Sequence, residues 1–364
     1  AVPLLQSAVD PLSPEEFRNR LVEALDSMAA AGIVFVEEGN ADARTVQALQ
    51  DLDQSGRLPT RVGVMLATQG PDPDTTLLRE WLSRGPLRAD TGMLEVRAVK
   101  AFYDGAMGSR GALMLEDYSD QPGHRGRGGD SYGFGRDWLG QFAAAGYQVV
   151  IHAIGDAANQ QALDFFDSLY TAQPRARDQR NRIEHAQVVA PSDMPRFGRL
   201  DVIASMQLIH AMDDMPWAEQ RIGPERIRGA YAWRDLRRAG ARLAFSSDMP
   251  GADHHIFNQL HAAVTRANAR SEPNGGWYPE QRLTPEEALR GYTTWAAWAT
   301  SHEQQTGTLT AGKWADLTVM DMDPLALPVS GYDRILGGKI VLTMVGGRAV
   351  YDATVRTARA AASR

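Results

Sequence analysis

Hydrophobic and polar positions along the chain alternate between a helical and an extended pattern. The first clear segment opens with Ser13 and Glu16, which have the spacing of a capping box, and continues with apolar residues at helical spacing up to Gly32. The next stretch, GIVFVEEG, is short, apolar and rich in β-branched residues, which predicts a strand. A helix over about 41–55 and a strand over 61–66 repeat the order, as is typical of α/β proteins.

Five more apolar runs predict strands, with amphipathic segments between most of them. These runs are LEVRAVKAF, YQVVIHA, NRIEHA, VIASMQ and RLAFSSD. Short runs that are apolar on both faces favour a parallel sheet with crossover helices. A (β/α)8 TIM barrel needs eight strands, whereas this chain shows seven and begins with a helix, so we predict a TIM barrel whose first strand is absent from this chain. A doubly wound open sheet is the alternative.

The pattern changes after a predicted helix at 284–299. The stretches ADLTVMD and VLTMVGGRAVYD alternate apolar with polar residues, and the second contains a Gly-Gly turn, so both predict strands of a small β-rich portion. We therefore expect a barrel over 1–307 and the C-terminal strands of a small β-sandwich over 308–364.

Composition narrows the classes of partner and ligand. The net charge of -7 comes from interspersed acidic and basic residues, which argues against a nucleic-acid partner, and no apolar run approaches the roughly 18 residues of a membrane span. The chain has no cysteine, so possible metal ligands are His, Asp, Glu and a modified Lys. The lack of cysteine and of a visible signal peptide leads us to expect a cytoplasmic protein.

Polar residues follow five consecutive predicted strands. They are Lys100, His152, His185, His210 and Asp248. Any one of them has a structural explanation, because a single strand-end His is commonly a buried structural residue and a strand-end Asp commonly caps a helix. The series is harder to explain in that way, because catalytic groups of a barrel project from the carboxyl ends of its strands. Neutral imidazoles and a carboxylate suit Zn²⁺ or a similar divalent ion, which would activate a water molecule.

Several longer motifs resemble the amidohydrolase superfamily, and within it the amidohydrolase-3 group, which includes N-substituted formamide deformylase. The matching motifs, in order, are VKAFYDGAMGSRGA, VVIHAIGDAANQQALD, RIEHAQ, SMQLIHAMDDMPWAEQRIGPERIRGAYAWRDL, AGARLAFSSDMP, AAVTR, LTPEEALRGYTTWAA and GTLTAGKWADLTVMD. The resemblance covers the chain from about 32 to 352, and it implies a TIM barrel of the metal-dependent hydrolase type.

The resemblance also implies roles for individual residues. Lys100 would be carboxylated and would bridge two metal ions, and His152 and His185 would bind the second metal. Asp248 would bind the first metal and take a proton from the attacking hydroxide, and His210 would contact substrate. Within the same motifs, two more residues are expected to bind substrate: Asp104 and Arg266.

One departure from the family pattern is important. Family members carry His-x-His at the end of the first strand as ligands of the first metal, and this sequence contains no His-x-His. We therefore expect at most one well-held metal ion, and poor or no activity unless the missing segment is supplied. His254 and His255 are the only adjacent histidines, and they are expected to be exposed helix residues.

These observations lead to a functional hypothesis. The resemblance implies a metal-dependent amidohydrolase that cleaves a non-peptide C–N bond, in an amide or formamide-like small molecule, with one or two divalent ions such as Zn²⁺. A lactonase, an esterase or an isomerase on the same site remains open, as does a non-catalytic scaffold that has lost its first metal. The oligomeric state also remains open, a homodimer included.

Overall fold

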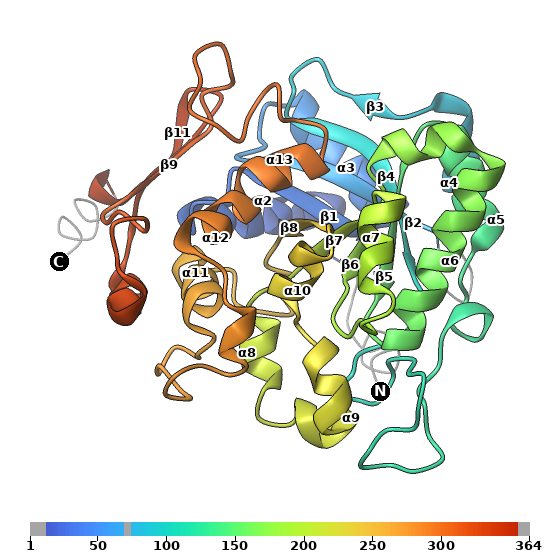
Figure 1. The fold of residues 1–364 in the computed structure, drawn as a ribbon. Coiled ribbons are helices and arrows are strands. Elements are labelled where there is room, and N and C mark those ends of the chain that lie inside the picture. The colour runs from blue at the N-terminus through green and yellow to red at the C-terminus, as the bar shows by residue number, and fades with distance from the viewer. Residues whose placement is uncertain (1–11, 69–73, 356–364) are drawn as a thin grey trace.

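The computed structural model describes residues 12–68 and 74–355, and its central feature is a curled sheet of parallel strands (Figure 1). The strands on the main path are β1 (Phe35–Ala41), β2 (Arg61–Ala67), β4 (Leu94–Phe102), β5 (Gln148–Ala153), β6 (Arg182–His185), β7 (Ile203–Met206) and β8 (Arg242–Phe245). Each pairs in parallel with the next. All seven predicted strands are confirmed, and β3 (Leu87–Arg88), a two-residue strand antiparallel to β4, was not predicted.

Helices connect the strands and cover the outside of the sheet (Figure 1). They are α2 (Pro14–Ala30), α3 (Ala43–Gln54), α4 (Thr75–Arg84), α5 (Arg136–Ala144), α6 (Asp156–Ala172), α7 (Met194–Leu200), α8 (His210–Asp214), α9 (Ala218–Arg226), α10 (Trp233–Arg238) and α11 (Ile256–Thr265). This order of strand and helix fits a TIM-barrel-like fold. Within the described part of the chain the sheet is open, because its path ends at β1 on one side and at β8 on the other.

Two predicted helices can be compared directly with the structure. The capping box at the start of α2 is confirmed, since the Ser13 hydroxyl accepts the Glu16 N–H and the Glu16 carboxylate accepts the Ser13 N–H. The single helix predicted at 284–299 is instead two, α12 (Pro285–Tyr292) and α13 (Thr294–Ala299). They are separated at Thr293, whose φ of -124° and ψ of -91° are not helical.

The C-terminal portion forms an antiparallel sheet of three strands: β9 (Leu317–Met320), β10 (Ile340–Val345) and β11 (Arg348–Asp352). This sheet accounts for part of the predicted β-sandwich. It is tied to the first helix and to β2, because the Thr343 hydroxyl donates to the Ala29 carbonyl and Arg61 donates to both oxygens of Asp316 at 2.7 and 2.9 Å. The Arg61 and Asp316 side chains are only 4% and 1% exposed, so this ion pair is an internal link between the two portions.

The Gly-rich segment after β4 packs closely against the loop that precedes it. A Cβ on Gly126 would lie 2.0 Å from the Ala112 carbonyl oxygen, whereas a Cβ on Gly123 would have no atom within 4 Å. Both glycines have a left-handed φ, +76° and +79°. Only Gly126 therefore combines the left-handed backbone with a close approach of two main-chain segments.

We expect Gly126→Ala to destabilise the protein more than Gly123→Ala. The left-handed φ costs an alanine about 1–2 kcal/mol at either position. The clash with Ala112 should add roughly 1–3 kcal/mol at position 126 alone. Urea denaturation of the two variants and the wild type measures the difference, and equal losses would show that the close approach has no energetic weight.

No helix of the described residues is long and apolar enough to cross a membrane.

Candidate metal centre

The side chains that follow the central strands meet at the carboxyl edge of the sheet. In the register of the strands, Phe102 lies opposite His152 and Ala153 lies opposite His185, so the ends of β4, β5 and β6 are adjacent. His210 is the first residue of α8 and follows the end of β7 by four residues, and Asp248 follows the end of β8 by three residues. Parallel strands place their carboxyl ends at one edge, and this explains why residues distant in the sequence are brought together.

The imidazoles form a continuous row across this edge. The ring centroids of His152 and His185 are 4.5 Å apart in a T-shaped arrangement, and those of His185 and His210 are 5.8 Å apart and stacked. His210 Nε2 lies 3.5 Å from Asp248 Oδ2. One ligand atom each from His185, His210 and Asp248 lie within 4.8 Å of one another, which is a cluster able to hold a metal ion.

Burial keeps the site residues in the forms that bind metals. Burial, reinforced by Lys100 and His210, lowers the pKa of His185 to about 3, and burial lowers the pKa of His152 well below its usual value. Both imidazoles are therefore neutral at neutral pH, as metal ligands must be. The pKa of Lys100 is also lowered, mainly by burial and against the opposing effect of Glu184. The uncharged amine of Lys100 is therefore more populated than that of a solvated lysine.

Backbone strain accompanies the ligands. His185 has a φ of +75°, Ala186 one of +42° and Asp248 one of +59°, all in the left-handed region that favours glycine. Such conformations cost of order 1–3 kcal/mol each and persist where the surrounding structure enforces them, commonly at functional sites. Here two of the three strained residues are predicted metal ligands, one at the end of β6 and one shortly after β8.

Asp104 lies beneath the site, and its predicted role in binding substrate stays a prediction. Its carboxylate is 0% exposed and accepts the N–H groups of Leu113, Ile154 and Gly155. Burial raises the pKa of Asp104 to about 7 despite these three hydrogen bonds. Its Oδ1 lies 3.5 Å from His152 Nε2, so it contacts a predicted ligand.

Arg266 is also buried, and its predicted role in binding substrate stays a prediction. The residue is 0% exposed, and its guanidinium packs over the rings of Trp233 and Trp277 at 4.3 and 5.2 Å. It donates to the carbonyls of Tyr231 and Trp277, so it holds loops together. Sequence reasoning could not distinguish such a structural arginine from one that faces the site.

Sequence reasoning missed a polar network inside the barrel. Arg182 donates to Glu184 at 2.6 Å, is paired with Glu37 and donates to Gln148 at 3.2 Å. Gln207 extends this network to the ligands, because its Oε1 lies 2.7 Å from His185 Nδ1. The signal was present in the motif RIEH, since a parallel strand buried on both faces seldom carries two charged residues two positions apart.

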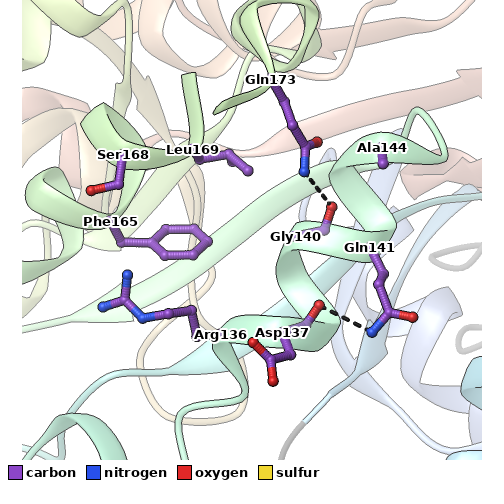
Figure 2. A pocket seen from close by; sticks show the side chains of 9 residues that line it. All are labelled: Arg136, Asp137, Gly140, Gln141, Ala144, Phe165, Ser168, Leu169 and Gln173. Carbon is purple, nitrogen blue, oxygen red and sulfur yellow. Dashed lines mark hydrogen bonds between the residues drawn. The ribbon is translucent and has the colours of Figure 1, made fainter. Parts of the chain in front are cut away.

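A hollow of the described surface lies away from these residues. It has a volume of about 560 Å³ and runs between α5 and α6 (Figure 2). Arg136 lies over the ring of Phe165 at 5.4 Å, and Gln173 closes one end by donating to the Gly140 carbonyl. None of the predicted site residues lines it, so it is separate from the candidate metal centre.

The donor set suits a divalent ion of the zinc type. Two neutral imidazoles and a carboxylate, with a position left open, match the composition of catalytic zinc sites. Among the described residues there are two clusters that could hold a metal ion: His185, His210 and Asp248, and Asp253, His254 and His255. Only the first lies at the carboxyl ends of the central strands with His185.

A model of the amidohydrolase family matches residues 1–351 of the chain. The chain is 31% identical to Protein LONG AFTER FAR-RED 3 of Arabidopsis thaliana, over 96% of the chain and 60% of the relative. It is 25% identical to the N-substituted formamide deformylase of Arthrobacter pascens, over 97% of the chain and 64% of that enzyme. The chain thus spans less than two thirds of these relatives.

Solved structures give a consistent picture. An uncharacterised metal-dependent hydrolase from Pyrococcus horikoshii OT3 superposes with a TM-score of 0.75 at 28% identity, over 88% of this chain and 62% of that one.

Proposed function

Since the chain belongs to the amidohydrolase family, we propose that it is a metal-dependent hydrolase that cleaves a non-peptide C–N bond in a small amide or formamide-like substrate. The observation that carries the proposal is the convergence of His185, His210 and Asp248 at the carboxyl edge of the sheet. Similarity to a formamide deformylase supports the bond type, and the family as a whole supports hydrolysis.

Four residues would hold the metal in this proposal: Lys100, His152, His185 and Asp248. A bound divalent ion would supply a Lewis acid for the scissile carbonyl and would lower the pKa of water toward about 7. Lys100 would take part as a carboxylated side chain, for which its buried amine with a lowered pKa is suited.

Asp248 has the properties of the proton carrier. Its side chain is 47% exposed, so the carboxylate can reach a substrate, and burial of its environment raises its pKa. A raised pKa makes the carboxylate a better proton acceptor at neutral pH. Asp248 would take a proton from the attacking water and pass it to the leaving nitrogen.

The same site could hydrolyse a lactone or an ester, because hydrolysis of either one needs an activated water and a polarised carbonyl. We favour the C–N bond on similarity alone, since a fold says little about substrate. The test is a panel of an N-formylamine, an N-acylamine, a lactone and an aryl ester, each incubated with the zinc-loaded protein and followed by NMR.

We expect turnover of the formamide or amide to exceed that of the lactone and the ester. The protein should be assayed with and without any residues that its gene encodes ahead of Ala1, because a His-x-His segment there would complete a second metal site. Preferential lactone or ester turnover in both forms would overturn the assigned bond type. No turnover of any substrate in either form would favour a non-catalytic scaffold.

A further inference from the structure

We propose that Tyr231, together with Gln187 and Asp214, positions α8 and thereby determines how well His210 contacts the substrate. This inference rests on the proposed function and goes further, because it makes substrate affinity depend on a buried hydroxyl group outside the metal site. Tyr231 is 2% exposed and Gln187 is 5% exposed. We refer to the side chains of Gln187, Asp214 and Tyr231 as the clamp.

The clamp is a closed triangle of hydrogen bonds. The Tyr231 hydroxyl donates to Asp214 Oδ2 at 2.5 Å, and the Gln187 amide Nε2 donates to the same oxygen at 3.0 Å. Gln187 Nε2 also donates to the Tyr231 hydroxyl at 2.8 Å. An amide nitrogen carries two hydrogens, and a hydroxyl can donate and accept, so all three bonds can exist at once. Burial raises the pKa of Asp214 to about 6, so at pH 8 a charged carboxylate accepts both bonds.

The clamp joins two segments of the candidate site. Asp214 is the last residue of α8, and His210 is the first. Gln187 lies two residues after the predicted ligand His185, on the loop that leaves β6. Tyr231 lies in the segment just before α10 and bridges the two. The clamp therefore fixes the end of α8 relative to the loop that carries a metal ligand.

The start of α8 is held by a different contact. The Ile209 N–H donates to Gln259 Oε1 at 3.2 Å, and the Tyr292 hydroxyl donates to the same oxygen at 2.9 Å. A helix of five residues has too few internal hydrogen bonds to be stable alone. The orientation of α8 therefore depends on contacts such as these at its start and the clamp at its end.

Loss of the Tyr231 hydroxyl should release α8 and leave the metal ligands in place. The Tyr231 main-chain N–H donates to the Gln187 carbonyl at 2.7 Å, and this bond does not involve the hydroxyl. The His185 imidazole remains within 2.7 Å of Gln207 Oε1. Asp214, in contrast, would keep only the bond from Gln187 within the clamp.

Tyr231 is itself held in a strained conformation. Its φ of +50° is in the left-handed region. Its carbonyl accepts from Arg266 at 3.1 Å, and its ring centroid lies 5.5 Å from that of Trp277. Such strain persists where the surrounding structure enforces it, commonly at functional sites. Phenylalanine can keep these contacts, so Tyr231→Phe removes the hydroxyl alone.

The test compares steady-state kinetics at pH 8 of the zinc-loaded wild type, Tyr231→Phe, His210→Ala and the double variant. The substrate is the preferred one of the panel, and the protein is the form that hydrolyses it. Tyr147→Phe is the matched control, because Tyr147 is 0% exposed and its hydroxyl donates to the Trp81 carbonyl, outside the clamp. Bound Zn²⁺ and hydrogen exchange of α8 in the metal-free proteins are measured in parallel, and circular dichroism verifies folding.

We expect Tyr231→Phe to raise KM by roughly 10–100-fold, the range set by the loss of one hydrogen bond to a charged group. Its kcat should change by less than about threefold, because the metal ligands and Asp248 stay in place. The double variant should have the KM of His210→Ala, because Tyr231 acts through His210. Bound Zn²⁺ should be unchanged, and α8 should exchange faster than in the wild type and in Tyr147→Phe.

Two substitutions of Asp214 separate its position from its charge. Asp214→Asn retains an oxygen that can accept from both Tyr231 and Gln187, so its KM should stay within about threefold of the wild-type value. Asp214→Leu accepts no hydrogen bond and should raise KM as Tyr231→Phe does. A KM raised equally by both substitutions would overturn the inference.

Three further results would overturn the inference while the proposed function stands. They are a wild-type KM for Tyr231→Phe, exchange of α8 in that variant no faster than in the control, and KM increases from Tyr231→Phe and His210→Ala that multiply in the double variant, as independent effects would. If the wild type hydrolyses no substrate of the panel, the proposed function fails and the inference fails with it.

Discussion

Asp248→Asn should lower kcat for the preferred substrate by roughly 10²–10⁴-fold, the usual contribution of a positioned acid–base group. The amide retains the shape of the side chain but cannot take a proton from the attacking water. The KM should change much less, because the substitution removes the proton carrier from the site without removing a large contact to the substrate. Steady-state kinetics at saturating Zn²⁺ measures both constants, and saturation separates the loss of the proton carrier from weaker metal binding.

Asp137→Asn is the matched control, because Asp137 is an exposed residue of the outer hollow between α5 and α6. It should retain wild-type kcat and KM. A kcat for Asp248→Asn within twofold of the control would contradict the assignment of Asp248 as the proton carrier.

Arg182→Met should reduce the free energy of unfolding by about 3–5 kcal/mol, the usual cost of removing one partner from a buried ion pair. The Arg182 side chain is 3% exposed and pairs with Glu184, which is 8% exposed, and with Glu37. Methionine fills the volume but leaves the Glu184 carboxylate without its main partner in a place that water does not reach. Urea denaturation, analysed by linear extrapolation, measures the loss.

Arg20→Met provides the comparison, because the Arg20–Glu23 pair is exposed, with side chains 69% and 63% accessible. Its loss should be within about 0–1 kcal/mol. A double variant, Arg182→Met with Glu184→Gln, should recover part of the stability by removing the buried charge. A loss of less than 1 kcal/mol for Arg182→Met would show that the interior network is not a major source of stability.

Local sequence patterns were sufficient to predict the strands and their order. The apolar runs of the seven strands on the main path and the capping box at Ser13 and Glu16 depend on neighbours within a few residues, so they are visible without tertiary information. The convergence of the strand-end residues was also predictable, because it follows from parallel strands sharing one edge. The family resemblance is confirmed by the match over residues 1–351.

One prediction was wrong, and the surroundings of several other residues depend on contacts between distant segments. The predicted helix at 284–299 breaks at Thr293, although its composition suits a single helix. Asp104 and Arg266 have the right residue types for substrate binding, but their burial depends on how the loops after β4 and α11 fold back. Gln207 and Glu184 were overlooked because their importance lies in the hydrogen bonds they make to other strands.

The fold and the site support different levels of functional detail. The proposed hydrolysis with a divalent metal is supported by the family and by a donor set of neutral imidazoles and a carboxylate. The bond that is cleaved depends on how substrate fits above these ligands, and the family shares one site among several reactions.

The central claim, that one metal site at the carboxyl edge of the sheet carries out hydrolysis, is tested most directly by metal removal and return. The wild-type protein and His185→Ala would be stripped with a chelator, supplied with Zn²⁺ in steps, and assayed on the preferred substrate of the panel while bound metal is counted. We predict that activity disappears with the metal, returns in proportion to bound Zn²⁺ in the wild type, and does not return in His185→Ala. Undiminished hydrolysis by the metal-free protein would contradict the account.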